Sequence, residues 1–279
     1  MNLILQSSTD NPVSEQTIAA LAALCQPRQT VQTSHNVWKL CNAHPCAALE
    51  EQCRALALDY AWVPENLSLQ QFSLFVTDMD STLINIECID ELADLQGVKQ
   101  QVCEITEASM RGKLDFATSL RQRVHLLRGL PVEAMQQVYE QRLALNPGAH
   151  RLLKQLQQAS IYTVLVSGGF SYFTDRLRAE LGFDEAYGNT LGCENGILTG
   201  ELTGPVIDAQ AKAEHLIRAA RQQGIQPQQS IAVGDGANDL LMIHAAGLGI
   251  AYHGKPVLQQ QAGICLNHCG LDGILNLFC

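Results

Sequence analysis

Three short apolar runs constrain the fold of this chain most strongly, because each one ends abruptly in polar or glycine residues. They are FSLFVTD at 72–78, YTVLVSGG at 162–169 and SIAVGDG at 230–236. Such runs, followed by turn residues and a helical pattern, are typical of parallel strands that helices cover on both faces. We therefore expect an α/β fold with a Rossmann-like, doubly wound parallel sheet. Ligands of such sheets bind beyond the carboxyl ends of the strands, where the polar clusters lie.

The stretch between the first two runs has more helical pattern than one strand crossover needs. Its segments are broken by Gly or Pro and include no convincing strand. We expect a small helical-bundle cap, inserted at about residues 86–146 and placed over the strand ends. Further along, residues 186–204 carry the Asn-Gly signal of a β-hairpin.

The N-terminal part, residues 1–70, predicts a separate small α+β domain. Its connector to the rest, VPENLSLQQ, is rich in Pro, Asn, Ser and Gln, and the larger core with its cap would take residues 71–279. No catalytic constellation occurs in the small domain, so a regulatory, a dimerising and a packing role all stay open. The expected elements are strands at 2–6 and 29–41 and helices at 13–25 and 48–61.

Composition and charge exclude several classes of protein. Hydrophobic residues make up 47% and charged residues 16%, as in an ordinary globular protein. The net charge is 18 − 28 = −10 with no basic run, so we expect no nucleic-acid partner. The apolar stretches fall far short of the ~20 residues that span a bilayer, so we expect no membrane partner.

The N-terminus and the cysteines predict a cytoplasmic location. The first residues have no basic leader, and their apolar part is too short for a signal peptide. The ten cysteines are scattered and include no CxxC pair, so we expect free thiols in a reducing compartment.

Two aspartates, Asp78 and Asp80, follow the first run directly. Residues i and i+2 of a strand face the same way, so both carboxylates could point into one site. Adjacent carboxylates repel each other unless a divalent cation or a shared proton relieves them. For such a pair in isolation, a solvated strand end with a helix N-cap at Ser81 or Thr82 is the alternative.

The third run adds two further carboxylates, Asp235 and Asp239, with glycines that let the backbone approach a ligand. If the first and third strands are neighbours, Asp235 converges with Asp78. Three or four carboxylates at one edge suit a hard, oxygen-seeking ion, and we expect Mg²⁺. Alone, this motif could equally be a capped turn, but its combination with the first pair favours a metal site.

The second run supplies an anion-binding corner, and a helix after it supplies a cation. Ser167, the free amides of Gly168 and Gly169 and the start of the next helix could bind an anion, although most such turns bind only water. Lys212 lies early in a helical pattern at 209–223, where a solvated lysine is the ordinary interpretation. An aspartate-rich site would repel a phosphate dianion without a nearby cation, and this requirement singles out Lys212.

Taken in order, these motifs resemble the haloacid-dehalogenase (HAD) superfamily and, within it, the phosphoserine phosphatase family. Two further segments, IECIDELAD with Glu87 and MRGKLDFATSLRQRV at 110–124, narrow the resemblance. It covers about residues 72–275, where the helical insert is similar to the family's small cap, and does not extend convincingly to residues 1–70. The four superfamily motifs are matched by DMDST at 78–82, SGG at 167–169, Lys212, and GDGANDL at 234–240.

The resemblance implies an enzyme that hydrolyses O-phospho-L-serine to L-serine and inorganic phosphate, the last step of serine biosynthesis. Asp78 would be the nucleophile that forms an aspartyl-phosphate. Asp80 would protonate the departing serine oxygen and then deprotonate the attacking water. Mg²⁺ would be held by the Asp78 carboxylate, the backbone carbonyl of Asp80, and Asp235.

The resemblance also implies which residues hold the phosphoryl group. Ser167 and the amide of Gly168 would bind phosphoryl oxygens, and Lys212 would neutralise charge beside the nucleophile. Asp239 would orient Lys212 or the water molecules of the metal. Asn238 would contact the substrate or its phosphate.

Four cap residues would recognise the amino acid. The resemblance implies that Glu87 meets the ammonium group and Arg123 the carboxylate, while Met110 and Phe116 close the pocket. The arginine fork suits a carboxylate because it can bind both oxygens. An ordinary ion pair within the cap is the alternative for Glu87 and Arg123.

Three other functions stay open. The phosphoryl group could pass to another hydroxyl, such as that of homoserine, which would make the chain a phosphotransferase. A non-enzymatic, receiver-like phosphoacceptor also uses an aspartate, Mg²⁺ and a lysine, but it needs neither an acid at Asp80 nor a cap. Residues 1–70 could bind serine. The sequence also leaves a homodimer open.

Overall fold

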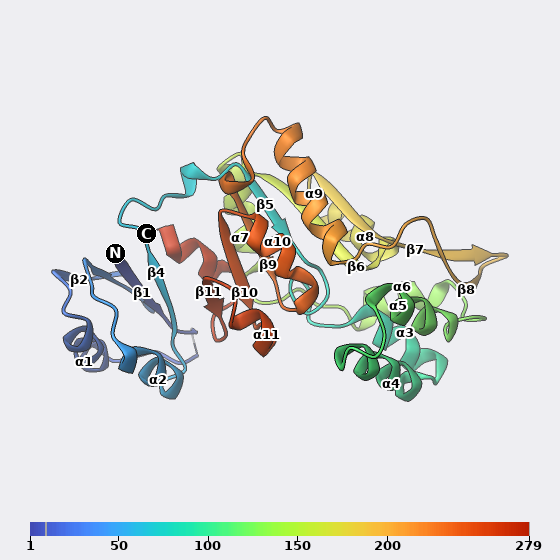
Figure 1. Cartoon of the computed structure of the whole chain (residues 1–279), viewed down its shortest axis with the longest axis horizontal. Helices are drawn as coiled ribbons and strands as arrows, with labels where there is room; N and C mark the ends of the chain where they lie inside the picture. The colour runs from blue at the N-terminus through green and yellow to red at the C-terminus, as the bar shows by residue number, and fades with distance from the viewer. Residues whose placement is uncertain (9, 279) are drawn as a thin grey trace.

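The three apolar runs form neighbouring strands of one sheet in the computed structural model, which describes residues 1–8 and 10–278. The sheet has the order β11-β10-β9-β5-β6-β7-β8, and β5 pairs in parallel with both β6 and β9. This places the three polar clusters at one edge of the sheet, as predicted (Figure 1). The strands are β5 (Leu74–Thr77), β6 (Tyr162–Phe170), β7 (Glu185–Glu194), β8 (Ile197–Thr203), β9 (Ser230–Gly234), β10 (Leu248–Tyr252) and β11 (Ile264–Leu266).

Helices cover both faces of this sheet, which confirms the predicted doubly wound α/β fold. Phe75 belongs to the apolar cluster that includes side chains of α7 and α8, whereas Leu74 and Val76 belong to the cluster with α9 and α10. Alternate residues of β5 are therefore buried on opposite faces, which explains why the run is continuously apolar. The helices are α7 (Ala149–Gln158), α8 (Ser171–Leu181), α9 (Ala209–Gln222), α10 (Leu240–Ala245) and α11 (Pro256–Gln259).

Four helices between β5 and β6 form the cap. Arg142, just after the last of them, pairs with Glu91 at 2.6 Å and Asp94 at 2.7 Å and so joins the first cap helix to the fourth. The β7–β8 hairpin extends along the cap and turns at Asn195 and Gly196, whose φ angles of 51° and 78° match an Asn-Gly turn. The cap helices are α3 (Cys88–Gln96), α4 (Lys99–Met110), α5 (Phe116–His125) and α6 (Glu133–Gln141).

The N-terminal residues form a second, four-stranded antiparallel sheet in the order β2-β3-β1-β4. The predicted helix over 48–61 was wrong at its end, because residues 59–61 belong to a strand. Ala57 has a φ of 51°, which ends the helix, and the strand after it pairs with β1. The elements are β1 (Asn2–Gln6), α1 (Glu15–Cys25), β2 (Gln29–Ser34), β3 (Val37–Cys41), α2 (Ala47–Ala55) and β4 (Asp59–Val63).

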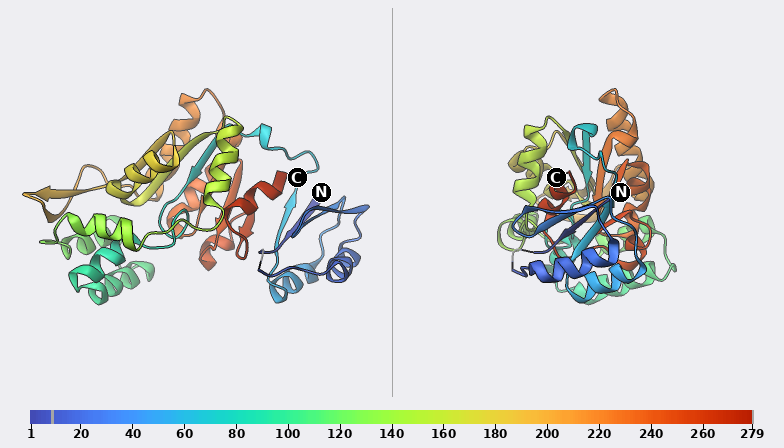
Figure 2. Two further views of the ribbon diagram at one scale, coloured as in Figure 1. Left: turned by 180° about the vertical axis from the view of Figure 1, so that it is seen from behind. Right: turned by 90° about the vertical axis from the view of Figure 1, so that its left-hand side faces the viewer.

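The small sheet packs against the edge of the large one, at the opposite end of the molecule from the cap (Figure 2). Ile4 of β1 shares an apolar cluster with Phe72 and with Leu277 of the C-terminal 3₁₀ helix η4 (Leu271–Phe278). The Asp59 carboxylate accepts the backbone N–H groups of residues 267–269. Both apolar and polar contacts therefore hold the two sheets together. Two short 3₁₀ helices complete the connections, η1 (Leu69–Gln71) and η2 (Pro227–Gln229).

Within residues 1–8 and 10–278, every helix is too short or too polar to span a membrane. The nine cysteines in this part are all free thiols, and Cys279 lies outside the described residues.

Candidate active site

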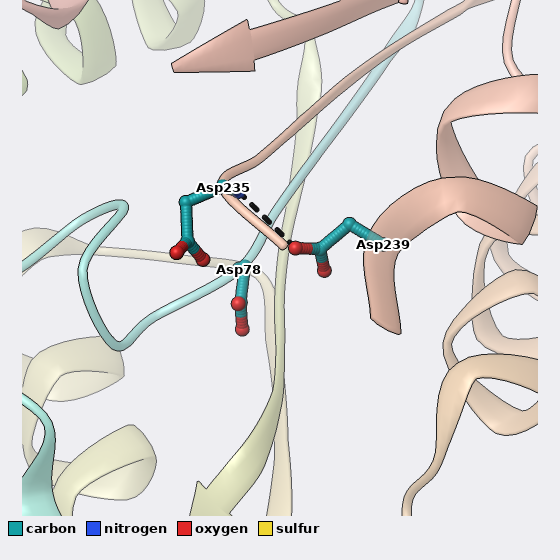
Figure 3. Close-up of side chains that lie close together, drawn as sticks. All are labelled: Asp78, Asp235 and Asp239. Carbon is teal, nitrogen blue, oxygen red and sulfur yellow. Dashed lines mark hydrogen bonds between the residues drawn. The ribbon is translucent and has the colours of Figure 1, made fainter. Parts of the chain in front are cut away.

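Three buried carboxylates meet where β5 and β9 end. The N–H of Asp78 donates to the carbonyl of Val233 at 3.0 Å, so the β5–β9 pairing continues to Asp78 and brings it beside Asp235. Asp239 follows in the 3₁₀ turn η3 (Ala237–Asp239). One carboxylate oxygen from each of the three aspartates lies within 4.8 Å of the others (Figure 3).

Lys212 lies among these carboxylates. Its Nζ is 2.7 Å from Oδ1 of Asp78 and 2.7 Å from Oδ1 of Asp239, and its side chain is buried. Burial alone would lower the pKa of Lys212, but Asp239 and Asp78 raise it above its ordinary value. The lysine therefore stays an ammonium ion. It is placed by the first turn of α9, whose N-cap Asp208 accepts the N–H of Ala211 at 2.9 Å.

Asp239 holds both Lys212 and the turn that carries Asp235. Its Oδ2 accepts the N–H of Asp235 at 3.1 Å (Figure 3). The same oxygen accepts the N–H of Gly236 at 3.0 Å. A side chain at Gly234 would overlap the Asp239 carboxylate, so only glycine fits there. The contact with Lys212 supports the predicted orienting role of Asp239, which stays a prediction.

The site contains more buried negative charge than its lysines compensate. Burial raises the pKa of Asp78 well above its ordinary value, and Asp239 raises it further against the opposing effect of Lys212. Burial likewise raises the pKa of Asp235, which Lys255 opposes. Closely spaced carboxylate oxygens with this excess charge fit a divalent cation, which would favour their ionised forms.

Asp80 lies outside the cluster of three and faces the cap and the second polar loop. Its Oδ1 accepts the N–H of Cys88 at 3.0 Å. Its Oδ2 faces Gly169, where any side chain would overlap it. Asp80 is buried, and burial raises the pKa of its carboxyl group above the ordinary value, whereas the hydrogen bonds from Cys88 lower it.

The loop at the end of β6 differs from the expectation in one detail. The N–H of Gly169 is not free, because it donates to Oγ of the buried Ser167 at 2.8 Å. The carbonyl of Gly168 accepts Nδ2 of Asn189 at 2.8 Å, which holds the loop against β7. Gly168 also lies under the ring of Phe116 from the cap, because a Cβ there would be 3.0 Å from Cζ of that ring.

Glu87 and Arg123 lie on the cap side of the site. Glu87 accepts a hydrogen bond from Ser81 Oγ at 2.8 Å, and burial together with the charge of Asp80 raises its pKa to about 7. Arg123 is partly buried in α5, and burial lowers the pKa of its guanidinium group against the opposing effect of the charges of Asp90 and Glu87. The cap thus places the carboxylates of Glu87 and Asp90 and the guanidinium group of Arg123 on this side of the site.

Two other predicted residues have fewer contacts. Asn238 is half-buried in the turn after Asp235, and a Cβ on Gly236 would overlap its Oδ1. Met110 is 71% exposed at the end of α4. Its predicted part in closing the pocket therefore has no contact to support it and stays a prediction.

Sequence reasoning missed Lys255 and Cys88. Lys255 Nζ lies 3.0 Å from Oδ2 of Asp235, and its N–H donates to the Asp235 carbonyl at 2.7 Å. Its only sequence signal is the following proline, which starts α11. No sequence signal points to Cys88, because the hydrogen bond from its N–H to Asp80 forms only when residues 81–88 fold back toward the strand end.

Comparisons with known proteins agree with this geometry. The haloacid dehalogenase-like hydrolase family model matches residues 75–244. A phosphoserine phosphatase from Polaromonas sp. is 50% identical over 76% of this chain and 92% of that protein. The chain belongs to the phosphoserine phosphatase family of haloacid dehalogenase-like hydrolases. It is therefore a phosphatase, and enzymes of this superfamily generally use a divalent metal.

Two solved structures extend the comparison. The unliganded structure of a probable phosphoserine phosphatase from Vibrio cholerae has a TM-score of 0.86 and 36% identity, and covers 99% of this chain and 85% of that one. The structural likeness thus includes residues 1–70, to which the sequence resemblance does not extend convincingly. A structure of a phosphoserine phosphatase with a phospho-aspartyl intermediate analogue has a TM-score of 0.70 and 40% identity, covering 75% of this chain and 99% of that one.

Proposed function

We propose that this phosphatase hydrolyses O-phospho-L-serine to L-serine and inorganic phosphate, with Asp78 as the covalent nucleophile and Mg²⁺ as the metal. One observation carries the proposal: Asp78, held by the buried Lys212, lies at the strand ends beneath a cap that presents Glu87 and Arg123. Serine phosphate carries a phosphate, an ammonium group and a carboxylate, and these groups match that arrangement.

The first step transfers the phosphoryl group to the enzyme. A carboxylate oxygen of Asp78 attacks phosphorus, and the bond between phosphorus and the serine oxygen breaks. The electron pair of that bond goes to the serine oxygen, which takes the proton of Asp80. Burial raises the pKa of Asp80 and so favours the protonated form that this step needs. The products are L-serine and an aspartyl-phosphate at Asp78.

The second step releases phosphate. Asp80, now ionised, takes a proton from a water molecule whose oxygen attacks phosphorus. The bond between phosphorus and the Asp78 oxygen breaks, and its electron pair returns to the carboxylate. Inorganic phosphate leaves, and both aspartates return to their starting forms. Because Asp80 first gives and then regains a proton, one residue serves both steps.

The rate acceleration of phosphate-monoester hydrolysis must come from several groups acting together. Hydrolysis of phosphate monoesters is accelerated up to ~10²¹-fold by enzymes, equivalent to roughly 28 kcal/mol. Proton transfer by a positioned residue such as Asp80 supplies about 10²- to 10⁴-fold, and one preorganised charge such as Lys212 about 10²- to 10³-fold. Ser167 and the Gly168 amide would add hydrogen bonds to phosphoryl oxygens, with Asn238 beside them.

The residues at the strand ends fit a bound cation. Asp78 and Asp235 would hold it with their carboxylates, and Asp80 would hold it with its backbone carbonyl. Mg²⁺ is proposed because oxygen ligands and a phosphate substrate are its usual partners. When bound, it supplies positive charge that offsets the repulsion between the phosphate and the aspartates.

Substrate choice is assigned to the cap. Glu87 would bind the ammonium group and Arg123 the carboxylate, while Phe116 covers the loop at Gly168. Met110 would complete the closure. The structural neighbour with a phospho-aspartyl intermediate analogue supports the same chemistry for this chain.

The test is phosphate release from a panel of phosphorylated amino acids and sugars, with and without Mg²⁺. We expect O-phospho-L-serine to be the best substrate, Mg²⁺ to be required, and Asp78→Asn to be inactive. Faster release from phosphosugars would contradict the roles of Glu87 and Arg123. Release that needs homoserine or another added hydroxyl would indicate a phosphotransferase, and a stable phosphoprotein without turnover would indicate a receiver-like module.

Other expectations also remain proposals. The division into a domain of residues 1–70 and a core of 71–279 is supported by the two separate sheets. A cytoplasmic location is supported by the free thiols of the described cysteines. A homodimer stays a prediction.

A further inference from the structure

We propose that the β7–β8 hairpin determines substrate length, because it sets the distance between the cap helix α5 and the loop at the end of β6. The base of the hairpin belongs to the core sheet, and its tip pairs with the cap (Figure 1). The inference rests on the proposed function, in which α5 supplies Arg123 and Phe116 and the loop supplies Ser167 and Gly168. A substrate must reach from one to the other.

The base of the hairpin is fixed to the phosphoryl-binding loop. β7 pairs with β6 as far as Asn189, beyond which its pairing passes to β8. The buried side chain of Asn189 donates from Nδ2 to the carbonyl of Gly168 at 2.8 Å and accepts the N–H of Ile207 at 2.8 Å. Ile207 lies where the chain leaves the hairpin, so one side chain holds the loop and both ends of the hairpin together.

The tip of the hairpin is bonded to the cap. Residues 128–132, which join α5 to α6, lie antiparallel to the start of β8. Leu198 of β8 accepts the N–H of Gly129 and donates its own N–H to the carbonyl of Leu130, both at 2.9 Å. The side chain of Leu198 is 2% exposed and belongs to the apolar cluster that includes Leu130. The tip therefore follows the end of α5.

Close packing sets the distance between β8 and α5. Gly200 has a φ of 77°, and a Cβ there would be 2.8 Å from Cβ of Arg128 and 3.0 Å from the carbonyl oxygen of His125, the last residue of α5. Nε of Arg128 also donates to the carbonyl of Thr199 at 3.0 Å. Glycine at this position therefore lets the backbone of β8 lie directly against the end of the helix.

These contacts form a closed path through core and cap. Gly168 is held by Asn189 at the hairpin base, and it also lies under the ring of Phe116, the first residue of α5. The hairpin tip holds the other end of the same helix. Arg123 lies between these two attachments, so its distance from the loop is set at both ends of α5.

The covalent connections of the cap lie side by side and leave it free to rotate. The segments that enter and leave the cap pair through an antiparallel bridge between Ile84 and Leu145. The N–H of Asn146 donates to the carbonyl of Leu83 at 2.9 Å in the same pairing. A body joined through one paired connection can turn about it. The hairpin supplies a second attachment that opposes this rotation.

A fixed distance between Arg123 and the loop selects substrates by length. O-phospho-L-homoserine carries the same three charged groups as O-phospho-L-serine, but one more methylene separates its phosphate from its carboxylate. One methylene in a fitted pocket is worth about 10- to 200-fold in discrimination. Weaker contact between hairpin and cap should reduce this discrimination, because α5 could then adjust to the longer molecule.

The experiment places a methyl group between the hairpin and the cap. Gly200→Ala has to displace Arg128 or the end of α5, and Gly196→Ala and Gly204→Ala are its matched controls. These two glycines have φ angles of 78° and 84°, so alanine introduces a similar backbone strain, but a Cβ at either position meets nothing within 4 Å. The comparison separates contact with the cap from strain in the hairpin.

In Gly200→Ala we expect KM for phosphoserine to rise by about 3- to 10-fold with kcat within about 2-fold, because the recognition helix is held less closely. The ratio of kcat/KM for phosphoserine to that for phosphohomoserine should fall by about 3-fold or more. The inhibition constant of inorganic phosphate, which needs the loop and not α5, should change by less than about 2-fold. Both control variants should match the unmodified protein in all three measurements.

Equal changes in Gly200→Ala and its controls would overturn the proposal, and so would an unchanged ratio between the two substrates. If phosphohomoserine is not hydrolysed, its inhibition constant against phosphoserine replaces its kcat/KM. If Gly200→Ala does not fold by circular dichroism, Arg128→Ala, which loses the bond to Thr199, is compared with Arg121→Ala on the exposed face of α5. The ratio must then fall in Arg128→Ala alone.

Amide hydrogen exchange tests the attachment without any substrate. The N–H groups of Gly129 and Leu198 should exchange about 3- to 10-fold faster in Gly200→Ala than in Gly196→Ala, because the hydrogen bonds between hairpin and cap open more often. Equal exchange would contradict the attachment itself. Failure of the unmodified protein to hydrolyse phosphoserine would instead count against the proposed function.

Discussion

Nζ of Lys212 and Oδ1 of Asp78 lie 2.7 Å apart, and their side chains are only 1% and 5% exposed. Two charges at this distance attract each other strongly away from water, but removing each from water is costly. The pair is viable because Lys212 also contacts Asp239 at 2.7 Å. A single buried cation therefore orients both Asp78, the proposed nucleophile, and Asp239, the carboxylate that holds the Asp235 turn.

Lys212→Met should damage both activity and stability. We expect kcat to fall by about 10²- to 10³-fold, because a preorganised charge beside the phosphoryl group is lost. The free energy of unfolding should fall by about 3–5 kcal/mol, because Asp78 and Asp239 remain buried without their partner. Phosphate release and urea denaturation measure the two effects. Exposed Lys154→Met is the control, and similar behaviour of both variants would contradict the central place of Lys212.

Asp78→Asn should abolish turnover while stabilising the protein in metal-free buffer. The folded-state pKa of Asp78 is raised, so its contribution to stability is present at low pH and is lost as pH rises above its ordinary value. Asparagine has no such loss, and the variant should be more stable at pH 7 by about 1–2 kcal/mol. Thermal unfolding at pH 5 and pH 8 measures this, and the advantage must grow with pH. A less stable variant at pH 8 would show that the Lys212 pair outweighs burial.

Much of the fold could be predicted from the sequence, because a continuously apolar strand must be buried on both faces of its sheet. The neighbouring placement of β5 and β9 then brings Asp78 and Asp235 together without further information. The predicted end of the second helix, at residue 61, was wrong because the apolar residues at 56–61 have a spacing that also suits a helix. Pairing of residues 59–61 with β1, a contact distant in sequence, overrides that preference.

Site residues that reach the site only because the chain folds back on itself could not be predicted from the sequence. Lys255 reaches Asp235 only because the loop after β10 returns to the strand ends. Cys88 contacts Asp80 through its backbone N–H, and a backbone donor has no signature in residue type. The amide of Gly169 was expected to be free because a sequence does not show that Ser167 Oγ would accept it.

Glu87→Gln should remove a pH-dependent step in substrate affinity. Glu87 binds an ammonium group only when ionised, and its pKa is raised to about 7 by burial and by Asp80. In the unmodified protein, kcat/KM for phosphoserine should therefore rise with pH through about 7. The variant should lack this rise and be weaker by about 10- to 100-fold at pH 8.

A substrate without the amino group tests the assignment of Glu87. On 3-phosphooxypropanoate the kcat/KM values of the unmodified protein and of Glu87→Gln should differ by less than about 3-fold, because no ammonium group is present.

The same substitution should also change how the stability of the protein depends on pH. A raised folded-state pKa means that stability is lost between about pH 4.5 and 7, so Glu87→Gln should be the more stable protein above pH 7. Equal pH profiles on phosphoserine would contradict the role.

Lys255→Met should tighten metal binding. Nζ of Lys255 lies 3.0 Å from Oδ2 of Asp235, and its side chain is 47% exposed. Removing this positive charge increases the attraction of Asp235 for a cation, by about 3- to 10-fold in Mg²⁺ affinity after solvent screening. Isothermal titration with Mg²⁺ measures the change, and Lys154→Met should leave it unaltered. Weaker binding in Lys255→Met would mean that the lysine supports the geometry of Asp235 rather than competing with the cation.

Asp59→Ala should loosen the N-terminal sheet without changing the chemistry. The Asp59 carboxylate is buried and accepts the N–H groups of Asn267, His268 and Cys269 at 2.7–3.0 Å. Alanine would leave these donors without partners, so we expect a loss of about 2–4 kcal/mol in the free energy of unfolding and faster proteolysis between residues 63 and 71. Turnover of phosphoserine should stay within about 2-fold, because the N-terminal sheet lies at the opposite end of the molecule from the cap and contributes no residue to the proposed site.

Glu51→Gln, on the exposed face of α2 beside the N-terminal sheet, is the control for this prediction, because it removes a carboxylate that accepts no backbone hydrogen bond among the described residues. Its stability should change by no more than about 0.5 kcal/mol. If Asp59→Ala is equally stable, the apolar cluster that contains Ile4, Phe72 and Leu277, together with the hydrogen bond from Asn276 to Gln6, is enough to hold the sheets together. A large fall in turnover with unchanged stability would instead mean that the loop at 267–269 transmits its position to Lys255 through α11 and β11, and that the N-terminal sheet contributes to the active site.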